Sequence, residues 1–140
     1  MIKGVLFDFF GTIVTYTPGN TYEKREGNSM NFLKNKGYIE DSNYIKDHFK
    51  AIYGEMTKET SHSCKEFTMH EWFDRAFKTL SKGQLTEDDL DKYISLYIQD
   101  WNHDVTYFEG IIELFATLKT KYKVGIISNT HYQPLVYNHL

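Results

Sequence analysis

Two short apolar segments, one near each end of the chain, constrain the fold more than any other feature. The first lies within Ile2 to Phe10, where an apolar run stops at Asp8. The second lies within Lys123 to Ser128, where another apolar run leads into the polar pair Ser128 and Asn129. Short apolar runs bounded by polar and turn residues are typical of buried β-strands. We therefore predict one buried strand in each segment.

The residues before the second segment predict a helix, and this order indicates the fold class. Apolar side chains follow Gly110 at helical spacing, namely Ile111, Leu114, Phe115, Leu118 and Tyr122. A helix followed by a strand, with a further strand earlier in the chain, is the alternation of a parallel α/β sheet. We therefore assign residues 1–14 and 105–140 to an α/β core.

The middle of the chain, residues 15–104, predicts helices and no convincing strand. Two stretches repeat apolar residues at i, i+3, i+4 and i+7 along one helical face, from Met69 to Leu80 and from Leu90 to Trp101. The second stretch follows Thr86 and three acidic residues, a pattern that caps a helix and suits its dipole. Both stretches therefore predict amphipathic helices.

Two weaker helical patterns complete this middle segment. One runs from Ile45 to Met56, and the other surrounds Met30 and Leu33. The turn-forming cluster Thr17 to Asn20 marks the start of the segment, and its end lies near residues 102–106. We therefore predict that the whole segment is a helical insert within the α/β core.

Composition and charge exclude several classes of protein. The net charge is −3, from 16 Lys and Arg against 19 Asp and Glu spread along the chain, so the sequence has no basic stripe for nucleic acid. No apolar run approaches the roughly 20 residues that span a bilayer, and the first residues lack the features of a signal peptide. A single cysteine excludes an intramolecular disulfide, and the six histidines show no metal-ligand spacing. We therefore expect a cytoplasmic protein without a nucleic-acid or membrane partner.

Polar groups at the ends of the two predicted strands are the candidates for chemistry. Ligands of parallel sheets bind at the carboxyl ends of the strands, and those ends carry Asp8 and Ser128 here. A partly desolvated carboxylate at such a place suits a nucleophile or a metal ligand. The Ser128 hydroxyl, the Asn129 amide and nearby backbone N–H groups suit an anion. We therefore predict a small anion pocket with the Asp8 carboxylate facing it.

Two motifs resemble those of the haloacid dehalogenase superfamily. The sequence Val-Leu-Phe-Asp-Phe-Phe-Gly-Thr of residues 5–12 looks like the first motif, and Val-Gly-Ile-Ile-Ser-Asn-Thr of residues 124–130 looks like the second. The superfamily inserts a helical cap between these motifs, which matches the long middle segment. The resemblance implies a Rossmann-like parallel core, incomplete here, with an inserted α-helical cap.

The resemblance also implies roles for the residues of both motifs. Asp8 matches the nucleophile, which forms a covalent aspartyl intermediate that water later hydrolyses. Ser128 matches the hydroxyl that binds an oxygen of the phosphoryl or carboxylate group, and Thr12 would orient Asp8. The substrate-binding set implied in this way is Ser128, Asn129, Thr12, Phe9 and Phe10. We therefore predict a hydrolase that acts on a small anionic substrate.

The residue two positions after Asp8 leaves two activities open. The phosphatase branch of the superfamily has an aspartate there as general acid, whereas this chain has Phe10. An aromatic residue is similar to the dehalogenase branch, because a halide leaves without a proton. That branch also binds the substrate carboxylate with an arginine, and Arg25 and Arg75 are the arginines of this sequence. The activity would be 2-haloacid dehalogenase-like or phosphatase-like.

The cofactor implied by the resemblance differs between the two branches. In the phosphatase branch, magnesium would bind to the Asp8 carboxylate and to the backbone carbonyl of Phe10. The dehalogenase branch needs no cofactor. We therefore expect magnesium only with phosphatase-like activity.

A second hypothesis is a chain that binds an anion without catalysis. The superfamily's third motif, a lysine, and its fourth, an acidic pair, follow the second motif, whereas this chain ends at Leu140. Two parallel strands with one crossover helix also cannot bury both faces of a sheet. This hypothesis describes a truncated, catalytically incomplete fragment that acts only in anion binding or assembly. It predicts self-association through the incomplete sheet.

Overall fold

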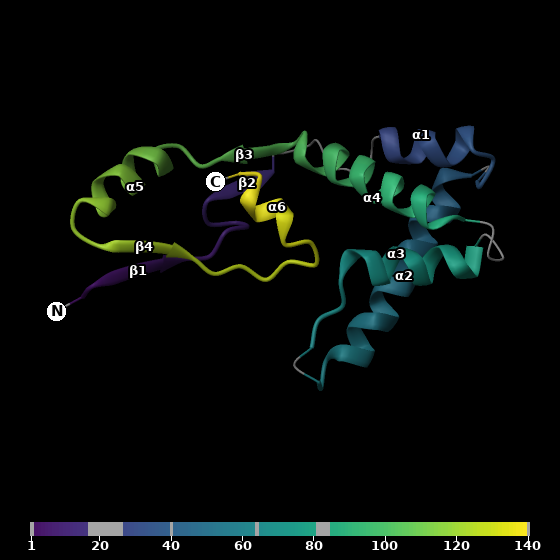
Figure 1. The fold of residues 1–140 in the computed structure, drawn as a ribbon, viewed down its shortest axis with the longest axis horizontal. Helices are drawn as coiled ribbons and strands as arrows, with labels where there is room; N and C mark the ends of the chain where they lie inside the picture. Colours follow the sequence, from purple (N-terminus) through teal and green to yellow (C-terminus); the bar gives the residue numbers. More distant parts are fainter. Residues whose placement is uncertain (1, 17–26, 40, 64, 81–84, 140) are drawn as a thin grey trace. The chain divides into compact units, whose positions relative to one another are not determined.

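The two predicted end strands pair in parallel and form the main sheet of the molecule. The computed structural model describes residues 2–16, 27–39, 41–63, 65–80 and 85–139. Strands β1 (Gly4–Phe7) and β4 (Lys123–Ile126) run side by side, with Val5 opposite Val124 (Figure 1). Helix α5 (Ile111–Lys119) leads into β4, as predicted. This arrangement of parallel strands and helix confirms the α/β class.

The elements fall into two units, Met1–Thr21 with Asp104–Leu140, and Tyr22–His103. The first unit holds the strands, α5 and the short helix α6 (Pro134–Tyr137). The helices of the second unit are α1 (Asn28–Asn35), α2 (Ser42–Thr60), α3 (Met69–Leu80) and α4 (Glu87–Asn102). None of the helices described here has the length and apolar character that crossing a membrane requires.

The prediction that both end strands are buried is wrong, because their side chains are half-buried on one face of the sheet and exposed on the other. Side chains alternate between the faces of a strand, and Phe7 packs against Phe115 of α5 with ring centroids 5.0 Å apart. Leu6, its neighbour on β1, is 66% exposed, and Ile127 is 62% exposed. Within the described residues, this sheet has two strands. Apolar character alone could not predict burial here, because burial also needs an element that covers the face.

A second, antiparallel pair of strands was not predicted. Strand β2 (Val14–Tyr16) pairs with β3 (Val105–Tyr107), and Thr15 lies opposite Thr106. The expectation that residues 15–104 contain no strand is therefore wrong at the start of that segment. A strand of three residues is too short to show an alternating pattern, and its partner is far away in the sequence.

Apolar side chains around the end of β1 form the core of the first unit. Its buried members are Phe9, Ile13, Val14 and Ile111. Residues of β1, β3, β4, α5 and α6 pack around them, including Phe7, Val105, Phe115, Ile126 and Val136. The segment that follows Asp8 is therefore anchored in the core.

Aromatic rings form the core of the helical unit. Phe73 is fully buried, and the rings of Phe49, Phe77 and Tyr93 lie 4.9 to 6.4 Å from its ring centroid. All four predicted helices are confirmed, with α3 at the predicted bounds. Helix α4 begins after Thr86, as predicted. The turn expected at residues 17–20 lies outside the described residues.

The buried carboxylate of Asp100 joins α4 to the first turn of α1. It accepts the backbone N–H groups of Asn28 at 2.9 Å and Ser29 at 2.8 Å, and the Ser29 hydroxyl at 2.7 Å. A Cβ atom on Gly27 would overlap this carboxylate, so the close approach requires glycine. Asp100 therefore satisfies donors that a helix N-terminus leaves unpaired.

A second group of polar contacts joins the other ends of the same two helices. The Tyr38 hydroxyl donates to Asp89 at 2.5 Å, and the Lys36 ammonium lies 2.9 Å from the same carboxylate. The hydrogen bond from Tyr38 and the contact with Lys36 hold the pKa of Asp89 below its usual value. The same hydrogen bond raises the pKa of Tyr38. Helix α1 is thus fixed to α4 at both ends.

Candidate functional site

Asp8 follows β1 directly and lies at the carboxyl end of the parallel sheet. One oxygen of its carboxylate, Oδ1, accepts the backbone N–H of Phe9 at 2.8 Å. The residue is exposed, so the expected partial desolvation is wrong for the described chain. The described residues leave the Asp8 side chain uncovered, although they bury the Ser128 hydroxyl at the same end of the sheet. The local hydrogen bond nevertheless limits the orientations of the carboxylate.

The turn after Asp8 is closed by hydrogen bonds to a single carbonyl. The Phe9 oxygen accepts the N–H groups of residues 12–14 at 2.8 to 3.3 Å, and the Gly11 N–H donates to the Val14 carbonyl at 2.8 Å. Gly11 has a φ of 77°, in the left-handed region that other residues rarely adopt. The turn is therefore well defined, and it fixes the backbone on which Asp8 sits.

The other residues predicted from the first motif have different environments. Phe9 is fully buried, with its ring centroid 4.9 Å from that of Phe10 and 5.8 Å from that of His139. Its side chain is therefore part of the core and can offer a ligand only its backbone. Thr12 is exposed, and its hydroxyl makes no hydrogen bond to any residue that the structure describes. Thr12 therefore does not hold Asp8 in this structure.

Ser128 lies just beyond β4, on the strand that pairs with β1. Phe7 is opposite Ile126, and the Ile127 N–H donates to the Phe7 carbonyl at 2.9 Å, so the two strands end together. The Ser128 Oγ atom is buried and has no hydrogen-bond partner among the described residues. Leaving a buried hydroxyl unpaired costs about 1–3 kcal/mol. Such an atom is available to pair with a ligand or with a water molecule.

Ser128 lines a cavity of about 950 Å³ formed by α5, β4, α6 and the end of β3. Its walls are mainly aliphatic and aromatic, with polar groups from Tyr107, Thr130, Gln133 and His139. The Tyr107 hydroxyl donates to the His139 carbonyl at 2.9 Å, and burial lowers the pKa of His139. Tertiary folding brings these residues together, and no sequence pattern marked them.

The cavity brings together only part of the predicted site. Ser128 is among its lining residues, whereas Asp8, Thr12 and Asn129 are not. Asn129 is exposed. Parallel pairing therefore places both motifs at one end of the sheet, but the cavity itself is centred on the second motif.

Arg75, one of the two arginines considered for substrate binding, does not line this cavity. Arg25 lies outside the described residues. Arg75, on α3, makes two hydrogen bonds of 2.7 Å to the Glu59 carboxylate on α2. The Arg75 guanidinium holds the pKa of Glu59 below its usual value. Arg75 is therefore already engaged in joining two helices.

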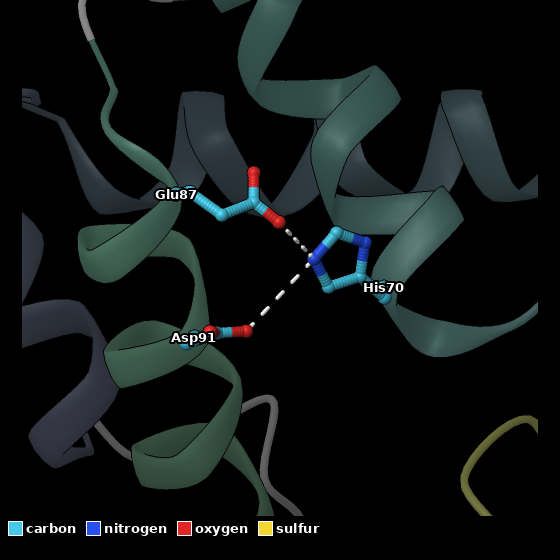
Figure 2. A group of neighbouring side chains, drawn as sticks. All are labelled: His70, Glu87 and Asp91. Atoms are coloured by element: carbon cyan, nitrogen blue, oxygen red, sulfur yellow. Dashed lines mark hydrogen bonds and ion pairs between the residues drawn. The ribbon is translucent and has the colours of Figure 1, made fainter.

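One group of metal-binding side chains occurs in the described part of the chain, and it lies on the helical unit. Figure 2 shows His70 of α3 facing Glu87 and Asp91 of α4. The His70 Nε2 atom lies 2.8 Å from Glu87 and 3.9 Å from Asp91. The Glu87 and Asp91 side chains are largely exposed to solvent, whereas the His70 side chain is half-buried. Sequence spacing could not reveal this group, because its members come from two helices; the i, i+4 spacing of the acids was the only local sign.

The residues expected to bind magnesium do not form a complete site in the described chain. Magnesium needs about six oxygen ligands in near-octahedral geometry. No described group of three metal-binding side chains includes Asp8. The Asp8 carboxylate and the Phe10 carbonyl therefore do not fit a magnesium ion by themselves.

Comparison with protein families identifies the class to which this fold belongs. The family model of haloacid dehalogenase-like hydrolases matches residues 34–138. This match covers more than half of the chain, including α5, β4 and Ser128, and begins after Asp8. The chain therefore belongs to the haloacid dehalogenase-like hydrolase family. A comparison with curated proteins gave no match.

Proposed function

We propose that the chain hydrolyses a small anionic substrate with Asp8 as the nucleophile and with Ser128 and Asn129 binding the anion. The observation that carries this proposal is the buried, unpartnered Ser128 hydroxyl at the end of β4. The strand beside it is the one that ends at Asp8. An anion held by Ser128 would satisfy the hydroxyl and bring its reacting centre to the end of the sheet that carries Asp8.

The Asp8 carboxylate suits nucleophilic attack. Its Oδ1 atom accepts the Phe9 N–H, and its other oxygen makes no hydrogen bond to a described residue. In the proposed reaction, this second oxygen forms a bond to carbon or phosphorus, and the leaving group departs with its electron pair. Water then hydrolyses the ester or acyl phosphate and regenerates the Asp8 carboxylate.

Phe10 favours substrates whose leaving group needs no proton. A positioned general acid contributes about 10² to 10⁴ in rate, and Phe10 cannot donate a proton. Halide, aryl phosphate and acyl phosphate substrates meet this condition, whereas alkyl phosphates do not. The proposed activity is therefore 2-haloacid dehalogenase-like, or phosphatase-like on activated phosphates.

The first experiment follows the reaction in water enriched in oxygen-18, with enzyme in excess over substrate. A panel of 2-haloacids, aryl phosphates and acyl phosphates is screened for halide and phosphate release. For a haloacid, water attacks the ester carbonyl, so Asp8 gains the heavy oxygen and the first product carries none. For a phosphate, acid quenching should capture a phosphoryl adduct on the peptide that contains Asp8. Mass spectrometry of that peptide distinguishes the two branches.

The same experiment can contradict the proposal. Turnover of a haloacid with heavy oxygen in the first product and none in Asp8 would mean direct attack by water. Turnover of a phosphate without any adduct on the Asp8 peptide, at several quench times, would also exclude the covalent route.

Ser128→Ala should affect binding and stability in opposite directions. The change removes a hydrogen bond to a charged ligand, worth about 1.5–3 kcal/mol, so the Kd for inorganic phosphate or lactate should rise about tenfold or more. It also removes a buried unpaired hydroxyl, so the first unit should be as stable as before or slightly more stable. Isothermal titration calorimetry and thermal unfolding followed by circular dichroism measure the two effects.

Thr120→Ala is the matched control for Ser128→Ala. The Thr120 hydroxyl lies in the same unit, is exposed and donates to the Thr117 carbonyl at 2.7 Å. Its loss should lower stability slightly and leave the Kd unchanged. If Ser128→Ala instead destabilised the fold and bound anions normally, Ser128 would have a structural role.

A second candidate function is anion binding without turnover. The observation that favours it is that Ser128 lines the cavity whereas Asp8 does not. This candidate predicts that phosphate or lactate binds with no product formed from any member of the substrate panel. Binding that depends on Ser128, without turnover, would support it over the hydrolase.

A further inference from the structure

We propose that the helical unit has a binding site of its own for a small planar aromatic anion. The site is a pocket of about 510 Å³ lined by residues of α1, α2, α3 and α4. Its volume lies within the roughly 300–1,000 Å³ typical of small-molecule sites. This pocket shares no lining residue with the cavity at Ser128. The proposal therefore does not depend on the hydrolase function.

The aromatic wall of this pocket is held in place before any ligand binds. The Trp72 ring stacks on Phe73, with centroids 4.3 Å apart and an angle of 20° between the planes. Tyr53 and Tyr97 contact it edge to face at 5.1 and 6.2 Å. The Trp72 Nε1–H donates to the Phe49 carbonyl at 3.0 Å. Trp72 therefore has its polar group satisfied and offers only ring surface.

The apolar surface of this wall is only partly covered by the protein. Trp72, Tyr53 and Tyr97 are each half-buried and line the pocket, whereas Phe73 behind them is fully buried. Covering aromatic surface releases about 25 cal/mol per Å², and stacked or edge-to-face ring pairs add about 0.5–1.5 kcal/mol. A planar aromatic group therefore fits this wall better than an aliphatic one.

The charges at the pocket select an anion. Lys46 and Lys50 lie one turn apart on α2 and both line the pocket, and Asp47 is the one acidic residue among its lining residues. Lys50 is exposed and forms no ion pair with a described residue. The lining thus carries two positive charges and one negative charge. A carboxylate attached to the aromatic group would pair with Lys50.

The test uses 2-naphthoate as the probe and the fluorescence of Trp72 as the signal. The chain has two tryptophans, and Trp101→Phe leaves Trp72 as the single reporter. We expect saturable quenching by 2-naphthoate, and a higher Kd for the uncharged analogue 2-naphthalenemethanol. Saturation-transfer NMR on the wild-type chain gives the same comparison without any substitution.

Lys50→Gln and Tyr97→Leu separate the two parts of the site. Lys50→Gln should raise the Kd of 2-naphthoate about twofold to fivefold, as expected for one exposed ion pair, and leave the uncharged analogue unaffected. Tyr97→Leu should weaken both ligands. The control is Lys92→Gln, an exposed lysine of α4 that does not line the pocket; it should change neither Kd.

Three results would overturn this proposal. The first is no saturable binding of 2-naphthoate by either method. The second is equal binding of the charged and uncharged ligands. The third is binding that is lost in Ser128→Ala, because the probe would then occupy the cavity of the other unit.

Discussion

Asp8→Asn is expected to lower kcat/KM for halide or phosphate release by about 10³-fold or more while both units stay folded. An amide oxygen is a poor nucleophile, and the covalent intermediate cannot form without the carboxylate. The fold should tolerate the change because residue 8 is exposed. The Asn oxygen can also still accept the Phe9 N–H that Asp8 accepts now. The measurement is steady-state kinetics on the best substrate of the panel, with circular dichroism as the check on folding.

The matched control for this prediction is Glu109→Gln. Glu109 is an exposed acid of the same unit, so its substitution changes the charge equally but leaves the β1 end intact. Its activity should equal that of the wild type. Undiminished activity in Asp8→Asn would contradict the proposal that Asp8 is the nucleophile.

Local sequence patterns predicted the elements whose formation depends on local properties. The periodicity of α3 and the Thr86 cap of α4 are contained in short stretches, so both helices could be placed closely. The parallel pairing of β1 with β4 also followed from element order. Strand β2 could not be predicted because it has only three residues and its partner strand, residues 105–107, lies far along the chain.

The environment of each site residue was much harder to predict than its position. The motifs located Asp8 and Ser128, but sequence could not show that the first is exposed and the second holds a buried, unpaired hydroxyl. Both properties depend on which elements cover the end of the sheet. Phe9 illustrates the same limit, since the chain turns its ring into the core rather than toward a ligand.

Asp100 was not distinguished from the exposed acids of its helix by any local pattern. Its hydrogen-bond partners precede it by 71 and 72 residues. We expect Asp100→Ala to lower the free energy of unfolding of the helical unit by about 2–4 kcal/mol. Each buried donor left unpaired costs about 1–3 kcal/mol, and relaxation of the helix end offsets part of this cost.

Urea unfolding followed by tryptophan fluorescence measures this loss in the helical unit. Both tryptophans of the chain, Trp72 and Trp101, belong to that unit. Asp100→Asn should cost less than Asp100→Ala, because the amide keeps one acceptor oxygen for the α1 donors. The Asn NH₂ group would replace the second oxygen and place a donor against a backbone N–H donor. The Asp100→Asn variant should therefore still be less stable than the wild type.

Asp88→Ala is the control that separates burial from charge. Asp88 is an exposed acid of the same helix, and its removal should cost less than about 1 kcal/mol through the helix dipole. If Asp100→Ala cost no more than Asp88→Ala, the hydrogen bonds to Asn28 and Ser29 would not stabilise the unit. A larger loss would mean that the link between α4 and the first turn of α1 stabilises the helical unit, because a helix of eight residues such as α1 depends on its tertiary contacts.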